Sequence, residues 1–302
     1  MNHEPESPVR QTQTYLRHLF QERGLRPKNK LGQNFLVDLN LIDFIAKNAE
    51  LTRADMVLEV GTGTGSLTAA LADQAGAVLS VEIDASFHAL VQETLGHHAH
   101  VQFFHGDILK NKNHLNPHVL EKLRAGFERF GGKHLKLVSN LPYVVATPVI
   151  SNLILADLPF ERMVVTVQWE IAERLMANPG TKDYGALAIL MQSLADIELL
   201  RKLPPSVFWP RPKVNSAIIR IQPRADKRRQ VSDPLRFRHF LRDLYAHRRK
   251  NLRGGLLSFP DKPWDKPDVD RKLGELGLDG NCRAETLDRH VHLRLCEVFG
   301  GH

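Results

Sequence analysis

The chain has 302 residues, of which 42% are hydrophobic, enough to fill one large domain and a smaller one. No stretch approaches the roughly 18 apolar residues of a membrane span, and the polar N-terminus has no signal-peptide core. Cys282 and Cys296 are the only cysteines, and their spacing fits neither a disulfide framework nor a zinc site. These features predict a cytoplasmic protein without a metal.

The formal net charge of +7 is unevenly distributed. The residues after 223 contain 18 Lys and Arg against 12 Asp and Glu, whereas the first 223 contain 23 against 22. A basic region beside a nearly neutral one indicates a polyanionic partner, most simply a nucleic acid. The alternative is a solvated surface that keeps the protein soluble.

Residues 1–29 are polar and basic and predict a flexible or surface-wrapped segment with a short amphipathic piece at 15–20. From residue 40 onward, strand and helix patterns alternate. Alternation of this kind predicts a doubly wound, mostly parallel α/β sheet. An insertion at 110–134 contains an expected helix, and a late strand at 217–221 suits an antiparallel sheet edge. The predicted parallel strands are 56–60, 78–83, 101–104, 135–139 and 163–167.

A polar linker at 223–233 precedes a region of helical patterns without β-branched runs. The sequence therefore predicts an α/β domain over 30–223 and a basic helical domain over 224–302. The expected helices are 235–245, 252–257, 269–276 and 284–299. Four basic residues of this domain are candidate phosphate contacts, or else a solvated face: Arg248, Arg249, Lys250 and Arg253.

Three motifs follow successive predicted strands. Glu59-Val60-Gly61-Thr62-Gly63-Thr64-Gly65 opens a helix after the first strand, and glycines there let a ligand approach the backbone. Glu82 ends the second strand, where a carboxylate can accept the ribose hydroxyls of an adenosine group. Asp107 follows the third strand and can accept a hydrogen bond from an adenine amino group. Together they predict a crevice for S-adenosylmethionine (SAM), which carries no phosphate.

A fourth motif, Asn140-Leu141-Pro142-Tyr143, follows the fourth strand. The 6-amino group of adenine is a poor nucleophile because its lone pair is delocalised into the ring. The Asn140 side-chain oxygen and the Leu141 carbonyl can accept its two hydrogens and favour a tetrahedral nitrogen. Pro142 stiffens the loop, and Tyr143 offers a face on which a flipped base can stack. The alternative is a proline turn with Tyr143 in the core.

The chain resembles ribosomal RNA adenine dimethylases of the KsgA type from about residue 30 to 287. The four motifs above carry this resemblance, and so do 31–36 (LGQNFL), 184–187 (YGAL), 208–217 (FWPRPKVNSA) and 247–252 (HRRKNL). It implies a class I SAM-dependent methyltransferase fold without a metal, acting as a monomer. The cofactor-contacting positions that it implies are Asn34, Leu36, Gly61, Glu82, Asp107 and Asn140.

The same resemblance implies dimethylation of two adjacent adenines in the 3′-terminal hairpin loop of 16S rRNA, within a partly assembled small ribosomal subunit. The chain departs from the family pattern at Val144-Val145-Ala146, usually polar, at Thr62, often proline, and in the longer insertion after Asp107. These departures concern substrate detail, because none is a residue with an assigned chemical role.

Three other functions compete with this one. An Erm-type methylase would modify a large-subunit rRNA adenine, and the 208–217 and 247–252 segments favour the KsgA type. An RNA-binding assembly factor with a vestigial fold is opposed by the intact motif at 140–143 with Glu82 and Asp107. A nicotinamide-dependent oxidoreductase is opposed by GxGxG in place of GxGxxG and by the lack of a hydride-transfer base.

Overall fold

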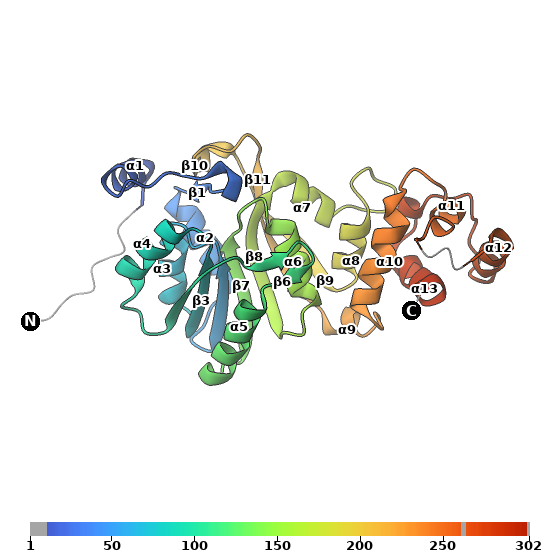
Figure 1. Ribbon diagram of the computed structural model, residues 1–302, viewed down its shortest axis with the longest axis horizontal. Coiled ribbons are helices and arrows are strands. Elements are labelled where there is room, and N and C mark those ends of the chain that lie inside the picture. The colour runs from blue at the N-terminus through green and yellow to red at the C-terminus, as the bar shows by residue number, and fades with distance from the viewer. Residues whose placement is uncertain (1–10, 261–263, 301–302) are drawn as a thin grey trace, which may run out of the picture. The chain divides into compact units, whose positions relative to one another are not determined.

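The computed structural model describes residues 11–260 and 264–300, and its chain divides into two compact units (Figure 1). The first comprises Met1–Trp169 and Glu198–Ile221, and the second comprises Glu170–Ile197 and Gln222–His302. Sequence analysis places a single boundary at residue 223 and assigns 170–197 to the first domain. Residues 170–197 thus belong to the second unit, although the chain on both sides of them belongs to the first. No local sequence pattern marks such an excursion, which explains the difference.

The central sheet has seven strands in the order β4-β3-β2-β7-β8-β11-β9. The pairs from β4 to β8 are parallel, as the predicted α/β class requires. Strand β11 pairs antiparallel with β8. The strands are β2 (Asp55–Val60), β3 (Ala77–Glu82), β4 (Val101–His105), β7 (His134–Asn140), β8 (Phe160–Gln168), β9 (Ala195–Leu203) and β11 (Ser216–Pro223).

The prediction that residues 217–221 form the sheet edge is wrong, because β9 lies outside β11. Strand β9 was missed in the sequence because its alternating apolar pattern is interrupted by charged side chains such as Asp196, Glu198 and Arg201. Charged side chains on an edge strand discourage pairing with other chains. Two short ladders join β1 (Phe35–Leu36) to β10 (Phe208–Trp209), and β5 (Leu109–Asn111) to β6 (His114–Leu115).

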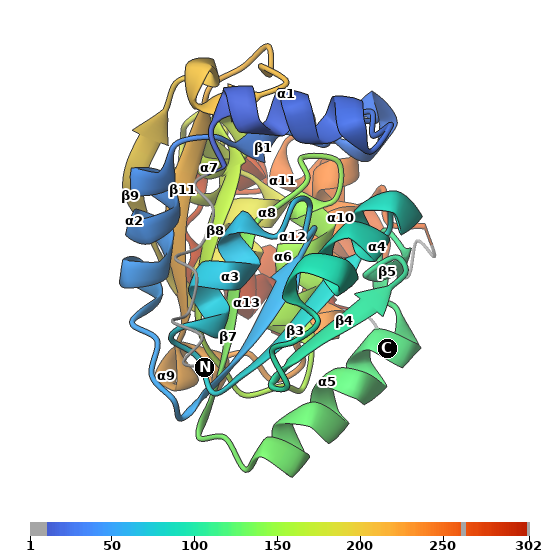
Figure 2. The same ribbon diagram turned by 90° about the vertical axis from the view of Figure 1, so that its left-hand side faces the viewer.

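Helices cover both faces of this sheet (Figures 1 and 2). Side chains alternate along a strand, so Val57, Val138 and Val164 pack with α2 and α3 in one apolar cluster. Helix α5 contacts β2 and β3. The helices are α1 (Gln13–Glu22), α2 (Leu39–Ala49), α3 (Ser66–Ala72), α4 (Ala85–Leu95), α5 (Pro117–Phe130) and α6 (Ala146–Leu155), with single turns η1 (Asn29–Leu31) and η2 (Pro205–Val207).

Helix α1 lies in the segment that was expected to be flexible or surface-wrapped. Its Leu16 and Phe20 are buried and pack with Phe35, Phe87 and Leu90. The Phe20 ring meets those of Phe35 and Trp209 edge-on, with centroids 5.3 and 5.1 Å apart. The helix is therefore anchored on the first unit, while residues 1–10 lie outside the described part of the chain.

The second unit is helical over its described residues, apart from the ends of β9 and β11. Helix α10 contacts α8, α11 and α13. A helix predicted from residue 284 instead begins at Arg289, where the Asp288 side chain accepts a hydrogen bond from Val291 N. Within the described residues, no helix is long and apolar enough to cross a membrane. The helices are α7 (Trp169–Leu175), α8 (Ala186–Gln192), α9 (Ala225–Arg228), α10 (Pro234–Ala246), α11 (Leu252–Leu256), α12 (Lys266–Glu275) and α13 (Arg289–Phe299), with the single turn η3 (Ala284–Thr286).

His292 on α13 is fully buried in this unit. Its Nδ1 lies 2.8 Å from the Asp288 carbonyl oxygen and must donate to it, so Nε2 accepts from the Tyr245 hydroxyl at 3.2 Å. These contacts suit a neutral imidazole. Burial lowers the pKa of His292 to about 4, although the Asp288 carbonyl opposes the shift.

We expect His292 to destabilise the protein in mild acid. An unfolded histidine has a pKa near 6.5, so below that pH the unfolded chain binds a proton that the folded chain does not. Stability is therefore lost as the pH falls from about 6.5 toward 4, with about 2 kcal/mol lost at pH 5. Urea unfolding at pH 7 and pH 5 measures the loss, and His292→Gln should lack this component. An equal pH dependence in both proteins would contradict the assignment.

Candidate active site

A cavity lies at the carboxyl ends of β2, β3, β4 and β7, where ligands bind in open α/β sheets. All nine residues that the sequence and the family resemblance indicate for cofactor binding or catalysis line this cavity. They come from five segments of the chain, and the structure brings them together: Asn34, Leu36, Gly61, Glu82, Asp107, Asn140, Leu141, Pro142 and Tyr143.

The glycine loop packs directly against the loop at 140–143. Gly61 has φ +83°, and its amide donates to the Val81 carbonyl at 2.8 Å. A Cβ atom at Gly61 would lie 2.8 Å from Pro142 Cγ, closer than real Cβ contacts. Glycine is therefore required by both the backbone conformation and the close approach of the two loops.

Glu82 is held rigidly in the wall of the cavity. One carboxylate oxygen accepts from Gly63 N at 2.9 Å, and the other accepts from Asp84 N at 2.8 Å. Burial raises the pKa of Glu82, while these two backbone hydrogen bonds oppose the rise. Asp84 caps α4 by accepting from Ser86 N.

Glu59 is a cavity residue to which sequence analysis assigned no role. Its carboxyl group is buried and accepts hydrogen bonds from the hydroxyls of Thr68 and Ser80, each at 2.6 Å. Burial raises its pKa to about 8, so the group is mainly neutral at pH 7. The sequence signal that could have identified Glu59 is an acidic residue inside an apolar strand, just before the glycine loop.

Asp107 lies at the rim of the cavity and is exposed. One carboxylate oxygen accepts from Leu109 N at 2.8 Å, and the Asn116 side chain donates to the Asp107 carbonyl at 2.9 Å. The start of the insertion after β4 therefore holds the Asp107 loop in place.

Asn140 ends β7, and its Nδ2 donates to the Asn34 carbonyl at 2.9 Å. Because that amino group is engaged by a carbonyl, Oδ1 is on the other side of the amide and is the acceptor that the side chain can offer to a substrate. Leu141 is buried.

Tyr143 is half-buried rather than free. Its hydroxyl lies 2.5 Å from the Ser216 hydroxyl, and its ring meets Phe208 edge-on at 6.5 Å. Burial raises the pKa of Tyr143, so the phenol is neutral at physiological pH. The Tyr143 ring lines the cavity and is held by its contacts with Ser216 and Phe208. This position is compatible both with stacking on a base and with a role in the core. Phe208 is buried.

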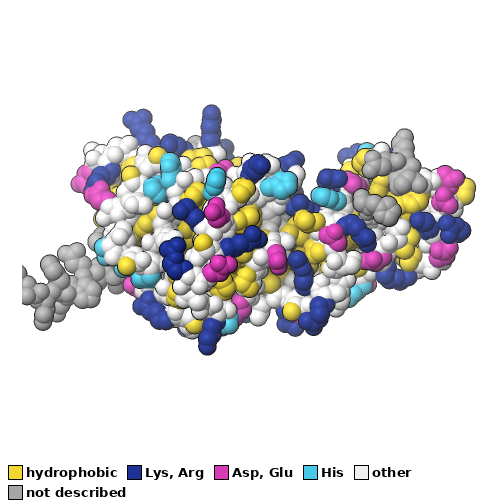
Figure 3. All heavy atoms as spheres, turned by 60° about the horizontal axis from the view of Figure 1, so that its bottom comes forward, with side chains coloured by type: hydrophobic (Ala, Val, Ile, Leu, Met, Phe, Trp, Pro, Cys, Tyr) yellow, Lys and Arg dark blue, Asp and Glu magenta, His cyan; other side chains and the backbone are white. Residues whose placement is uncertain are grey.

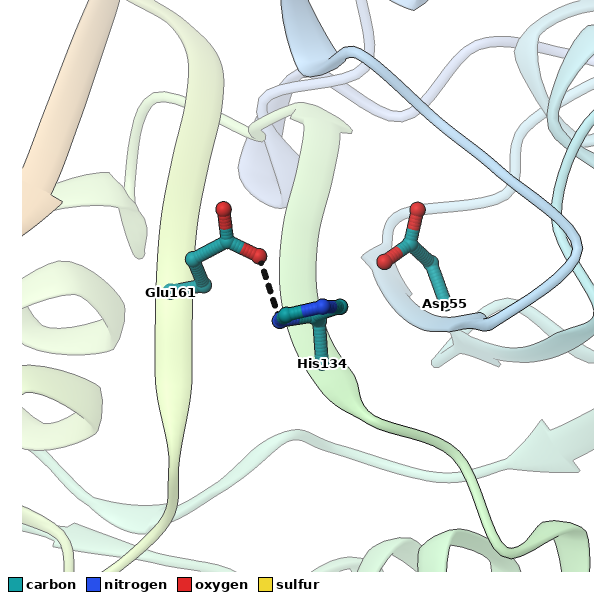
Figure 4. Close-up of side chains that lie close together, drawn as sticks. All are labelled: Asp55, His134 and Glu161. Carbon is teal, nitrogen blue, oxygen red and sulfur yellow. Dashed lines mark ion pairs between the residues drawn. The ribbon is translucent and has the colours of Figure 1, made fainter.

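A group of acidic and histidine side chains that could hold a metal ion lies elsewhere, at the amino ends of β2, β7 and β8 (Figure 4). Its ligand atoms are all within 4.8 Å of one another. His134 pairs with Glu161 at 2.8 Å, and Asp55 pairs with the buried Lys136 at 3.1 Å. The Lys136 ammonium already balances the charge of Asp55. The active-site cavity lies at the other end of these strands, at their carboxyl ends.

Comparison with known proteins identifies the family. Residues 24–272 match ribosomal RNA adenine dimethylase. The chain belongs to this family. A Ribosomal RNA small subunit methyltransferase A from Pelotomaculum thermopropionicum is 39% identical over 94% of this chain and 95% of the relative.

Two solved structures share the fold. The dimethyladenosine transferase from Plasmodium falciparum has a TM-score of 0.70 and 24% identity, over 87% of this chain and 96% of that one. The 23S rRNA methyltransferase ErmE has a TM-score of 0.59 and 26% identity, over 89% of this chain and all of that one. The dimethylase described here therefore has the predicted α/β fold of a class I SAM-dependent methyltransferase.

The residues present fit SAM. The cavity has carboxyl groups from Glu82 and Asp107, which suit a ligand that is cationic at sulfur. Gly63 leaves space beside Phe35 that a Cβ atom would fill, since such an atom would lie 3.1 Å from the ring. The glycines thus shape the floor of the cavity for a close-fitting ligand.

Replacing Gly61 by alanine should weaken ligand binding in this cavity by more than the backbone strain of the substitution alone would. Gly131→Ala is a matched control, because Gly131 also has positive φ, at +62°, but a Cβ atom there meets nothing within 4 Å. Both changes cost about 1–2 kcal/mol of backbone strain. Only Gly61→Ala should weaken S-adenosylhomocysteine binding, by about tenfold or more, as measured by calorimetry. Equal affinities in the two variants would contradict the packing argument.

Proposed function

We propose that this dimethylase transfers methyl groups from SAM to the 6-amino groups of two adjacent adenines in the 3′-terminal hairpin loop of 16S rRNA. The proposed substrate is the RNA in a partly assembled small subunit, bound by a single copy of the chain during subunit maturation. The orientation of Asn140 beside the cofactor cavity carries the chemical part of the proposal. The identity to a small-subunit methyltransferase, 39% against 26% for ErmE, favours the small-subunit substrate.

On the donor side, SAM supplies a methyl group activated by its sulfonium. Glu82, fixed by Gly63 and Asp84, accepts the two ribose hydroxyls. Asp107 accepts from the cofactor's adenine amino group with the carboxylate oxygen that Leu109 leaves free for a ligand. Asn34, Leu36 and Gly61 form the remaining walls.

On the acceptor side, a flipped adenine enters above Asn140 and stacks on Tyr143. Asn140 Oδ1 and the Leu141 carbonyl accept the two amino hydrogens, and this draws the nitrogen toward tetrahedral geometry with its lone pair facing the methyl group. Pro142, packed on Gly61, keeps the acceptor loop at a fixed distance from the donor. The Ser216 hydroxyl holds the stacking ring in place.

The transfer is an in-line substitution. A nitrogen–carbon bond forms as the sulfur–carbon bond breaks, the electron pair of the broken bond stays on sulfur, and the nitrogen then releases a proton to solvent. The protein contributes positioning and polarisation. Mass spectrometry of small-subunit rRNA from cells with and without the protein tests the substrate assignment. Unmethylated adenines at this loop in both would refute it.

Asn140→Ala removes one acceptor for the target amine. We expect single-turnover methylation to fall by about tenfold to a thousandfold, the range seen when one preorganised polar contact is lost. Affinity for S-adenosylhomocysteine should fall less than the rate. Methylation at the wild-type rate would show that Asn140 does not have the proposed role.

We also propose that the basic C-terminal residues grip the RNA backbone. Lys and Arg are interspersed with acidic side chains on the face seen in Figure 3, so individual residues must be distinguished. Arg248, Arg249 and Lys250 are exposed in the turn before α11. Arg253 instead forms an ion pair with Asp270 inside the second unit, which gives it a structural role and removes it from the candidate phosphate contacts.

Neutralising Arg248, Arg249 and Lys250 together should weaken RNA binding. The slope of log affinity against log salt should flatten by up to about three phosphate contacts, because fewer counterions are released. A control triple of the same charge, Lys266, Arg271 and Arg283, includes two arginines already paired with glutamates and should leave the slope unchanged. An unaltered slope in a stably folded first variant would rule out the contacts.

A further inference from the structure

A strap formed by residues 28–36 lines one wall of the active-site cavity through its residues 30–36. Its last two residues form β1, which pairs antiparallel with β10. The strap therefore has a firm end, at Phe35 and Leu36, both buried in the first unit. The start of the strap has no ladder of this kind and is held by side chains instead.

Asp84 holds the start of the strap. Lys28 Nζ lies 2.8 Å from Asp84 Oδ2, and Gln33 Nε2 donates to the same oxygen at 3.2 Å. The Gln33 side-chain oxygen, Oε1, also accepts from Lys28 N at 2.7 Å, which closes the strap into a loop. Burial alone would raise the pKa of Asp84, but the bonds from Lys28 and Gln33 keep it below its usual value. The three residues form a latch, Lys28–Gln33–Asp84.

The middle of the strap contacts the catalytic loop. The Asn34 carbonyl accepts from Asn140 Nδ2, and the Asn34 side chain donates to the Gly32 carbonyl at 3.2 Å. Gly32, with φ +66°, lies so close to that loop that a Cβ atom would meet Val144 Cγ2 at 2.8 Å and Tyr143 N at 3.2 Å. The position of the strap therefore determines where the Asn34 carbonyl lies, and with it the orientation of the Asn140 amide.

We propose that Lys28 and Gln33, acting through Asp84, are positioning residues that keep Asn140 Oδ1 directed at the target amine. This inference rests on the proposed function, because it assigns the latch to the same methyl transfer. Without the latch, nothing ties the start of the strap to Asp84, and the strap is held only by β1 and by the contacts of Gly32 and Asn34 with residues 140–144. The Asn34 carbonyl then has a range of positions, and the Asn140 amide loses the partner that selects its productive orientation. Lys28 and Asp84 do not line the cavity, and Gln33 lines it as part of the strap.

The test variant is Lys28→Met with Gln33→Met, which removes the latch and leaves Asp84 to cap α4. Arg26→Met is the matched control, since it removes the same charge two residues before the strap. Lys28→Arg keeps the ion pair and should behave as wild type. The Lys28 side chain is 56% exposed, whereas its partner Asp84 is 1% exposed. Removing both partners of a buried carboxylate lowers stability. We therefore expect the thermal midpoint of the latch variant to fall, whereas Arg26→Met and Lys28→Arg should match wild type, and the tests below are made well below all of these midpoints.

Amide hydrogen exchange tests, without any RNA, whether the latch holds the strap in place. With S-adenosylhomocysteine bound, the amides of residues 28–34 in the latch variant should exchange at least about tenfold faster than in wild type or Arg26→Met. Unchanged exchange would overturn the latch. If wild-type protein left the 16S hairpin unmethylated, the proposed function would fail, while the exchange rates would still decide whether the latch holds the strap.

Single-turnover methylation at saturating SAM then tests the link to Asn140. The latch variant should react about tenfold to a hundredfold more slowly, the loss that small misplacements cause. In an Asn140→Ala background the latch substitutions should cause no further loss, because the two act on one interaction. An equal further loss in that background would overturn the assignment, because it would show that the latch substitutions slow the reaction without acting through Asn140.

Discussion

The hydrogen bond from Asn140 Nδ2 to the Asn34 carbonyl joins two segments that are 106 residues apart. An amide side chain has two different ends, and a carbonyl partner accepts only from the nitrogen. This one contact therefore decides which atom of Asn140 faces the cavity. In the proposed mechanism, the strap, the latch and the short β1–β10 ladder hold that carbonyl in place, and the acceptor role of Asn140 depends on them.

The carboxyl groups of the site illustrate a second constraint. Glu59 and Glu82 both lie at the ends of apolar strands, where burial favours the neutral form. Burial raises the pKa of Glu59 to about 8 although two hydroxyls donate to it, whereas at Glu82 the donors that oppose the rise are two backbone amides. The same residue type, 23 positions apart, can thus serve as an internal brace at one place and as a ligand-facing acceptor at the other.

The second unit is built around buried groups of its own. His292 and Tyr245 complete each other's hydrogen bonds in its interior, and Arg253 is engaged by Asp270. The excess of basic residues after 223 therefore does not translate directly into RNA contacts. Charge counts indicate a class of partner, and the contacts of each side chain identify arginines with a structural role, such as Arg253.

Local patterns in the sequence were sufficient for the parallel strands, the helix of the insertion and the strand ends at Gly61, Glu82, Asp107 and Asn140. These features depend on periodicity and on glycine chemistry, which act over a few residues. Asn34 and Leu36 were identified only through family resemblance, because nothing in their own neighbourhood indicates a ligand. The tertiary structure alone decided four features: the place of β9 at the sheet edge, the inclusion of 170–197 in the second unit, the hydrogen bond between Tyr143 and Ser216, and the contacts of Lys28 and Gln33 with Asp84. Each is a contact between segments distant in sequence, and its strength depends on burial and on geometry that no local pattern encodes.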